Sequence, residues 1–248
     1  MKLPEVLILL GAGTLGGIFS TVVAIASLVS YPVLLALGVP PLSANMTNTV
    51  SLVLAGAGSV LGSRPELTGQ RDRVLRFGAV TALGGLAGAT VLLFTPASTF
   101  TAVVPVLIGA ASLLLLLQSR LAPKPDAKDR TVLRGAGLFI VAMYVGYFGA
   151  AAGIMLLLVL SSMIAEPLIR VNAIKNAVSG AANAMAAVCF MLFGTVRWLF
   201  VLPLAAGFLL GGWLGPKIAR RIPAGALRIA VSVCGLGLAI KLGISAYQ

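Results

Sequence analysis

Four polar residues at helical spacing are the part of this sequence best suited to binding chemistry. Asn172, Asn176, Ser179 and Asn183 follow one another at intervals of four, three and four residues, which places them on one face of a helix. The surrounding segment is apolar, so each polar group needs a partner or a cavity. Amide and hydroxyl donors, together with backbone amides at helix ends, suit a small anion because they bind it without trapping it.

A second polar face precedes the first by about 128 residues. Thr47, Asn48, Ser51 and Ser59 lie largely on one helical face, and Asn48 and Ser51 have the same spacing as Asn176 and Ser179. A duplicated polar face is typical of transporters in which both halves contribute to one site near the membrane midplane. The alternative is that these side chains only join helices, at about 0.6 kcal/mol per hydrogen bond, and contact no substrate.

Lys175 lies beside the second-half polar face, about one turn into the helix. Its ammonium group is a candidate for the positive charge that an anion requires, and the alternative is that it extends to the membrane interface. The sequence therefore predicts eight substrate-binding residues: Thr47, Asn48, Ser51, Asn172, Lys175, Asn176, Ser179 and Asn183.

The residues that are absent exclude most enzymatic chemistry. The chain has no His, and its six Asp and Glu residues all lie in or next to polar connections. Cys189 and Cys234 lie in apolar runs without metal-ligand spacing. We therefore expect no catalytic residues, no metal and no cofactor. Without a carboxylate relay in the membrane, coupling is expected to use protonation of the substrate or passive exchange.

The elements that carry these residues are predicted to be transmembrane helices. Apolar residues make up 59% of the 248 residues, charged residues make up 10%, and the mean hydropathy is +1.08. The fold class is therefore an all-α polytopic membrane protein. The apolar segments run at 6–38, 43–62, 75–94, 99–119, 134–164, 170–193, 197–215 and 226–246.

The charge distribution indicates topology rather than nucleic-acid binding. The net charge is +12, but Lys and Arg gather in short connections, as expected of cytoplasmic loops. A basic linker at 120–133 divides a first repeat, 1–119, from a second repeat, 134–248. In the first repeat the earlier connection is basic, around Arg71, and in the second repeat the later one is basic, around Arg220. Equivalent loops then lie on opposite faces, which predicts inverted repeats with both chain ends opposite the cytoplasm.

Two segments have lengths that do not fit one straight helix. The segments 6–38 and 134–164 are too long for one ordinary span, short for two, and rich in Gly. A broken or re-entrant hairpin in each place fits the inverted arrangement. One tilted helix in each place remains the alternative and gives parallel repeats.

The order of these motifs resembles the TauE/SafE sulfite exporter family, also called the toluene sulfonate uptake permease family, over nearly the whole chain. The resemblance rests on three stretches: Gly17–Pro32 with the Gly38–Pro41 turn and Ala44, Thr47 and Asn48; Gly146–Gly153; and Asn172–Asn176 with Asn183. One departure is the run Ala24, Ala26, Ser27 and Leu28, where the family usually has a glycine cluster. The resemblance implies movement of sulfur-containing anions such as sulfite or organosulfonates.

Together these inferences predict a multi-pass transporter of the cell (inner) membrane. We expect it to bind a small sulfur-containing anion near the midplane, to contact the lipid bilayer and to bind no nucleic acid. We expect export by alternating access, with an anion channel and a non-transporting membrane scaffold as the alternatives. The sequence leaves open which sulfur anion is moved, the direction, the coupling ion and the oligomeric state.

Overall fold

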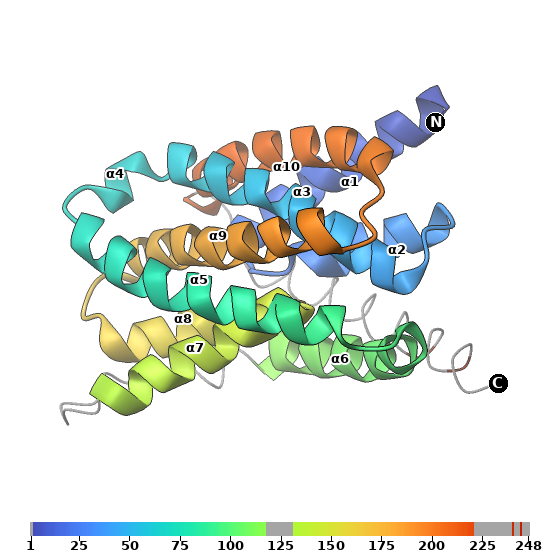
Figure 1. Cartoon of the computed structure of the whole chain (residues 1–248). Helices are drawn as coiled ribbons and strands as arrows, with labels where there is room; N and C mark the ends of the chain where they lie inside the picture. The colour runs from blue at the N-terminus through green and yellow to red at the C-terminus, as the bar shows by residue number, and fades with distance from the viewer. Residues whose placement is uncertain (1, 118–130, 221–239, 241–243, 245–248) are drawn as a thin grey trace.

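The computed structural model describes residues 2–117, 131–220, 240 and 244. These residues form α-helices and no strands (Figure 1). The helices are α1 Leu3–Val22, α2 Ala26–Ala36, α3 Pro41–Gly62, α4 Arg64–Leu67, α5 Arg71–Leu93, α6 Ala97–Leu117, α7 Thr131–Tyr147, α8 Ala152–Met163, α9 Leu168–Phe193 and α10 Trp198–Ala219. Most of the predicted linker and the last predicted segment, 226–246, lie outside the described residues.

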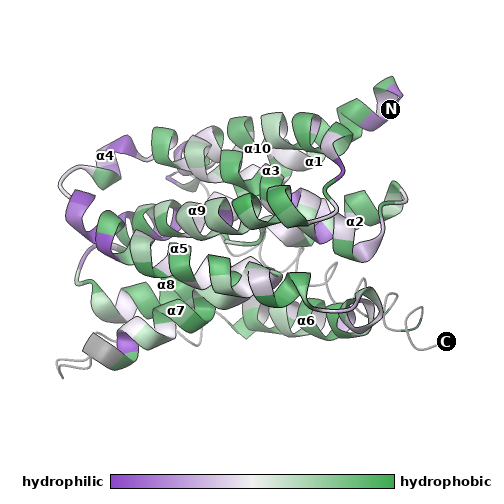
Figure 2. Cartoon of the chain, in the orientation of Figure 1, coloured by the Kyte–Doolittle hydropathy of each residue, from purple (hydrophilic) through white to green (hydrophobic). Residues whose placement is uncertain are grey.

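Five of the described helices are long and apolar enough to cross a membrane: α1, α5, α6, α9 and α10. Large apolar side chains are exposed on or beside them: Leu3 in α1 is 72% exposed, and Phe94, directly after α5, is 85% exposed. Figure 2 shows green, hydrophobic residues over most helices, whereas purple residues gather around α4 and the start of α5. A surface of this kind is stable against lipid. The prediction of an all-helical, multi-pass membrane protein is confirmed.

The helix α3 differs from these five because it is polar in its first half. It has the length of a membrane span, but residues such as Asn45, Asn48 and Thr49 lower its hydropathy. These side chains are buried in the protein, since α3 packs between α9 and α10. A helix enclosed by other helices needs no apolar face toward lipid.

Both overlong segments are broken into two helices. The chain leaves the α-helical conformation between α1 and α2, where Ala24 has φ +63°, and between α7 and α8, where Ala151 has φ +54°. Positive φ is uncommon for residues with a side chain and marks backbone strain that the surrounding structure must hold. Broken segments are therefore confirmed, and the alternative of one tilted helix in each place is wrong.

Contacts between the helices establish their relative directions. The start of α3 meets the end of α9, because the hydroxyls of Ser43 and Thr195 lie 2.9 Å apart, so these two helices are antiparallel. The helix α10 runs parallel to α3, with Gly58 against Leu209 and Gly62 against Trp213.

The helix α5 runs parallel to α9. Thr81 in α5 donates to the carbonyl of Val178 at 2.8 Å, and Gln70, just before α5, contacts Glu166, just before α9. The helix α5 is parallel to α9, the helix α10 is parallel to α3, and α3 and α9 are antiparallel. The helices α5 and α10 therefore also run in opposite directions.

Six of the ten described helices assemble into two groups of three. The first group is α1, α3 and α10, and the second is α7, α9 and α5. Each group combines two helices from one half of the chain with one from the other. At Gly17 against Gly212, and at Gly146 against Gly85, a Cβ atom would overlap backbone of the neighbouring helix, so only glycine allows this approach. The two groups meet where α3 crosses α9, at Gly56 and Gly180.

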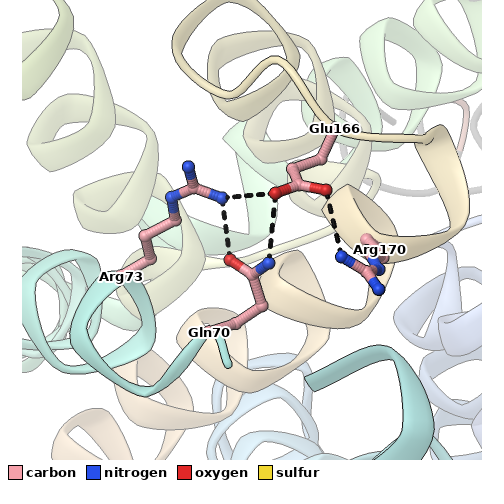
Figure 3. A network of polar contacts seen from close by, with 4 residues as sticks. All are labelled: Gln70, Arg73, Glu166 and Arg170. Carbon is pink, nitrogen blue, oxygen red and sulfur yellow. Dashed lines mark hydrogen bonds and ion pairs between the residues drawn. The ribbon is translucent and has the colours of Figure 1, made fainter. Parts of the chain in front are cut away.

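One end of the second group is fixed by a polar network (Figure 3). Glu166 accepts hydrogen bonds from Arg73 at 2.9 Å, Gln70 at 3.3 Å and Arg170 at 3.3 Å. The Arg73 bond, followed by the Gln70 bond, lowers the pKa of the Glu166 carboxyl below its ordinary value. This network ties the start of α5 to the start of α9.

At the same end, an ion pair fixes the first group. The guanidinium of Arg220 contacts both carboxylate oxygens of Glu66, at 2.7 and 2.9 Å, and so joins the end of α10 to α4. The Glu166 network therefore joins elements of the second group, whereas the Glu66 pair joins α10 of the first group to the short helix α4.

Candidate anion site

A small cavity lies where the two breaks meet the crossing of α3 and α9. Its volume, counted as space for the centres of water molecules, is about 40 Å³. It is bordered by α1, α2, α3, α7, α8 and α9 and by the backbone of both breaks. The polar side chains on its wall are Ser20, Ser27, Thr49, Ser59, Lys175, Asn176, Ser179 and Asn183.

Two helix N-termini border this cavity. The first residues of α2, Ala26 and Ser27, and those of α8, Ala152 and Gly153, all line it. Neither helix has a side-chain hydrogen bond at its N-cap. The first-turn amides of a helix have no carbonyl partner within the helix, and the aligned peptide dipoles make this end positive. Two uncapped N-termini at one cavity therefore favour an anion.

Two buried side-chain atoms on the wall have no hydrogen-bond partner among the described residues. They are the amide nitrogen of Asn176, a residue that is 6% exposed, and the hydroxyl of Ser59, a residue that is 2% exposed. A buried polar group without a partner costs about 1 to 3 kcal/mol, so such groups need an explanation. A ligand in the cavity that accepts hydrogen bonds from both supplies one.

Lys175 adds a positive charge to the wall. Its side chain is 1% exposed, and its ammonium group donates to the carbonyl of Ser20, in the last turn of α1, at 3.2 Å. Among the described residues that line the cavity there is no carboxylate. A buried cation without a counterion is unfavourable, and an anion in the cavity would neutralise it.

Comparison with known proteins gives the family. Residues 9–242 match the family described as Sulfite exporter TauE/SafE. The chain belongs to the TauE/SafE family. It is 26% identical over 220 residues to the probable membrane transporter protein YfcA of Escherichia coli K12, which covers 84% of this chain and 77% of that protein. It is 22% identical over 233 residues to the probable membrane transporter protein ORF9 of a Sinorhizobium species, covering 93% and 89%. No solved structure matches the chain significantly.

This TauE/SafE protein is therefore a membrane transporter, and the structure divides its eight predicted binding residues into two sets. Lys175, Asn176, Ser179 and Asn183 line the cavity together. The amide of Asn183 also donates to the carbonyl of Ser179 at 3.0 Å, within the same helix. The second-half polar face thus reaches the cavity along most of its length.

The first-half residues Thr47, Asn48 and Ser51 do not line the cavity. Asn48 accepts from the hydroxyl of Ser30 and donates to the hydroxyl of Ser27 at 3.1 Å, so it joins α3 to α2. Thr47 accepts from the backbone amide of Arg197 at 3.0 Å, and Ser51 donates to the carbonyl of Thr47 at 2.8 Å. In the present conformation Asn48 and Thr47 hold α3 to neighbouring elements, and Ser51 bonds within α3 itself.

Asn172 is also separated from the cavity wall. Its amide donates at 2.8 Å to the carbonyl of Thr21, near the end of α1. Asn45, which we did not predict, does the same in the other half, donating at 2.9 Å to the carbonyl of Tyr147, the last residue of α7. Both asparagines satisfy carbonyls that a helix end leaves without a partner.

Three polar residues of the wall, Ser20, Ser27 and Thr49, were not predicted, and Ser59 was placed on the first-half polar face but not among the substrate-binding residues. Ser59 lies on the α3 face that contains Ser51, so helical periodicity indicates it. Ser20 and Ser27 flank the first break, and only the position of that break brings them to the cavity. Ser27 lies in the run where the chain departs from the family's glycine cluster.

Proposed function

We propose that this TauE/SafE transporter exports a sulfur-containing anion, sulfite or an organosulfonate, and that it binds the anion in the cavity between the two breaks. The observation that carries the proposal is the pair of unpartnered donors, Asn176 and Ser59, facing the same small space as Lys175. Two helix N-termini and one ammonium group supply positive potential there. Neutral donors supply directional hydrogen bonds to anionic oxygens.

The size of the cavity favours sulfite over a bulky arylsulfonate. A water molecule needs about 10 to 15 Å³ of such volume, so 40 Å³ holds about three water-sized positions. Sulfite, with one sulfur and three oxygens, matches that space, whereas an aromatic ring does not. Sulfite is therefore the first substrate to test.

We also propose that residues 1–119 and 134–248 are inverted repeats that alternate in exposing the cavity to the two sides of the cell (inner) membrane. Support comes from the opposite directions of α3 and α9 and of α5 and α10, together with basic residues near Arg71 and Arg220. This topology puts Leu3 outside. A cysteine at position 3 that reacts only with a cytoplasmic reagent would contradict it.

Transport is tested in proteoliposomes with radiolabelled sulfite. A carrier shows saturable uptake and counterflow, in which unlabelled sulfite inside the vesicle accelerates entry of the labelled ion. A channel shows flux without counterflow, and a scaffold shows no flux. Loss of saturable uptake in Asn176→Ala, with Ser51→Ala as the matched control, supports the site. Wild-type protein that neither binds nor moves sulfite overturns the proposed substrate.

A further inference from the structure

Two hydrogen bonds of the same kind lie at opposite ends of the cavity. Asn172 of α9 holds the carbonyl of Thr21 at the end of α1, and Asn45 of α3 holds the carbonyl of Tyr147 at the end of α7. In both cases an asparagine on a long helix reaches the helix that precedes a break in the other half of the chain.

The positions of these asparagines place them just beyond the cavity. On α3 the wall begins at Thr49, and Asn45 lies one turn before it. On α9 the wall begins at Lys175, and Asn172 lies about one turn before it. Since α3 and α9 are antiparallel, the two asparagines lie on opposite sides of the crossing at Gly56 and Gly180.

Both bonds connect the two helix groups defined above. Asn172 belongs to the group α5, α7 and α9, and Thr21 belongs to the group α1, α3 and α10. Asn45 and Tyr147 connect the same groups in the reverse sense. The ion pair of Arg73 and Glu166 joins elements of the second group, and that of Glu66 and Arg220 joins the short helix α4 to the end of α10. Neither ion pair directly joins a long helix of one group to a long helix of the other. The asparagine bonds must break for the groups to separate at either end.

The carbonyls of Thr21 and Tyr147 have no backbone amide of their own helix to accept a hydrogen bond from. Carbonyls of the last turn of a helix have no amide one turn ahead to accept from. After α1 the chain turns away at Ala24, and after α7 it turns away at Gly149 and Ala151, all with positive φ. Away from water each such carbonyl needs a donor. If one end opened, entering water would take the place of the asparagine as donor, so the carbonyl would need the asparagine only while that end is closed.

We propose that Asn172 and Asn45 are positioning residues that close the two ends of the cavity. Asn172 closes the end that contains Glu166 and Arg220, and Asn45 closes the end that contains Thr195. The inference takes the cavity as the substrate site and so rests on the proposed function, but it concerns access and not the identity of the anion.

The test measures access from each side, without sulfite. A reporter cysteine replaces Ser179 on the cavity wall, in a background in which Cys189 and Cys234 are replaced by Ser. A membrane-impermeant methanethiosulfonate reagent is added to one side of oriented vesicles. Asn172→Ala should raise the labelling rate about tenfold from the Glu166 side only, which corresponds to a shift of about 1.4 kcal/mol between closed and open states. Asn45→Ala should raise it similarly from the Thr195 side only.

Asn48→Ala is the matched control. It also removes asparagine hydrogen bonds, but these join α2 to α3 and do not connect the two groups. It should leave the sidedness of labelling unchanged. If an Ala variant does not fold, Asn→Asp at the same position keeps the shape and removes the amide donor. Equal labelling changes from both sides, or no change in both asparagine variants, overturn the inference. Failure of wild-type protein to bind sulfite would count against the proposed substrate and leave this result standing.

Discussion

Asn176 and Asn48 have matching positions in the two polar faces, but the structure predicts opposite consequences for their replacement by Ala. Asn48 has two hydrogen bonds, to Ser27 and Ser30, whereas the amide nitrogen of Asn176 has no partner among the described residues. Asn48→Ala should therefore lower stability, and Asn176→Ala should lower affinity for the anion.

The expected magnitudes follow from the bonds that each variant loses. Asn48→Ala leaves the hydroxyl of Ser27 without this donor and removes the acceptor of Ser30, at a cost of about 1 to 3 kcal/mol in the free energy of unfolding. Asn176→Ala removes a buried amide that has no partner among the described residues, so stability should stay within about 0.5 kcal/mol. Loss of one hydrogen bond to a charged anion costs about 1.5 to 3 kcal/mol, which weakens sulfite binding by about tenfold to a hundredfold.

The assay combines thermal unfolding in detergent without sulfite and sulfite titration by calorimetry at fixed pH and ionic strength. Asn48→Ala should lower Tm and keep the dissociation constant, and Asn176→Ala should do the reverse. A fall in Tm for Asn176→Ala as large as that for Asn48→Ala, with unchanged affinity for sulfite, would refute the assignment of the free amide to the substrate.

Three further predictions test other parts of the structure. Ser59→Ala should weaken sulfite binding by about tenfold to a hundredfold without lowering Tm, since its hydroxyl has no partner among the described residues, as titration of folded variants will measure. Lys175→Gln should weaken binding by tenfold or more, about 1.4 kcal/mol, and Lys175→Arg should retain part of it, whereas equal affinity in both would exclude a charge contribution. Because hydrogen bonds from Arg73 and Gln70 lower the pKa of Glu166, its contribution to stability is present above the ordinary Glu pKa of 4.5 and is lost as the pH falls through the lower folded-state pKa. Glu166→Gln should therefore show a smaller loss of Tm between pH 6 and about pH 3 than wild type, and an unchanged loss would contradict this.

The helices could be predicted from the sequence because hydropathy and length are set by the membrane. The predicted segments 43–62 and 170–193 correspond to α3, Pro41–Gly62, and α9, Leu168–Phe193, within a few residues. The breaks followed from two segments of unusual length. The exact points at which the chain turns, at Ala24 and Ala151, could not be predicted, because alanine gives no signal for positive φ.

The candidate site could be predicted only in part. Helical spacing identified the face of α9 that lines the cavity, because Asn176, Ser179 and Asn183 lie there by geometry alone. Spacing cannot show which polar groups already have partners. Asn172 meets the carbonyl of Thr21, and Asn48 meets Ser27 and Ser30, only because the breaks bring those groups to them.

The difference between the two halves is what leaves a donor free for a ligand. The second and fifth residues of α2 are Ser27 and Ser30, and these hydroxyls satisfy the amide of Asn48. The second and fifth residues of α8 are Gly153 and Leu156, which offer no side-chain hydrogen bond. The amide nitrogen of Asn176, beside Lys175, therefore has no partner among the described residues. If the two halves were fully symmetric, the amides of Asn48 and Asn176 would either both have a hydrogen-bond partner or both lack one. If both had a partner, neither amide would be free to donate to the anion. The departure from symmetry in α2 and α8 thus stabilises one half, while the other half keeps a donor for the anion that we propose as substrate.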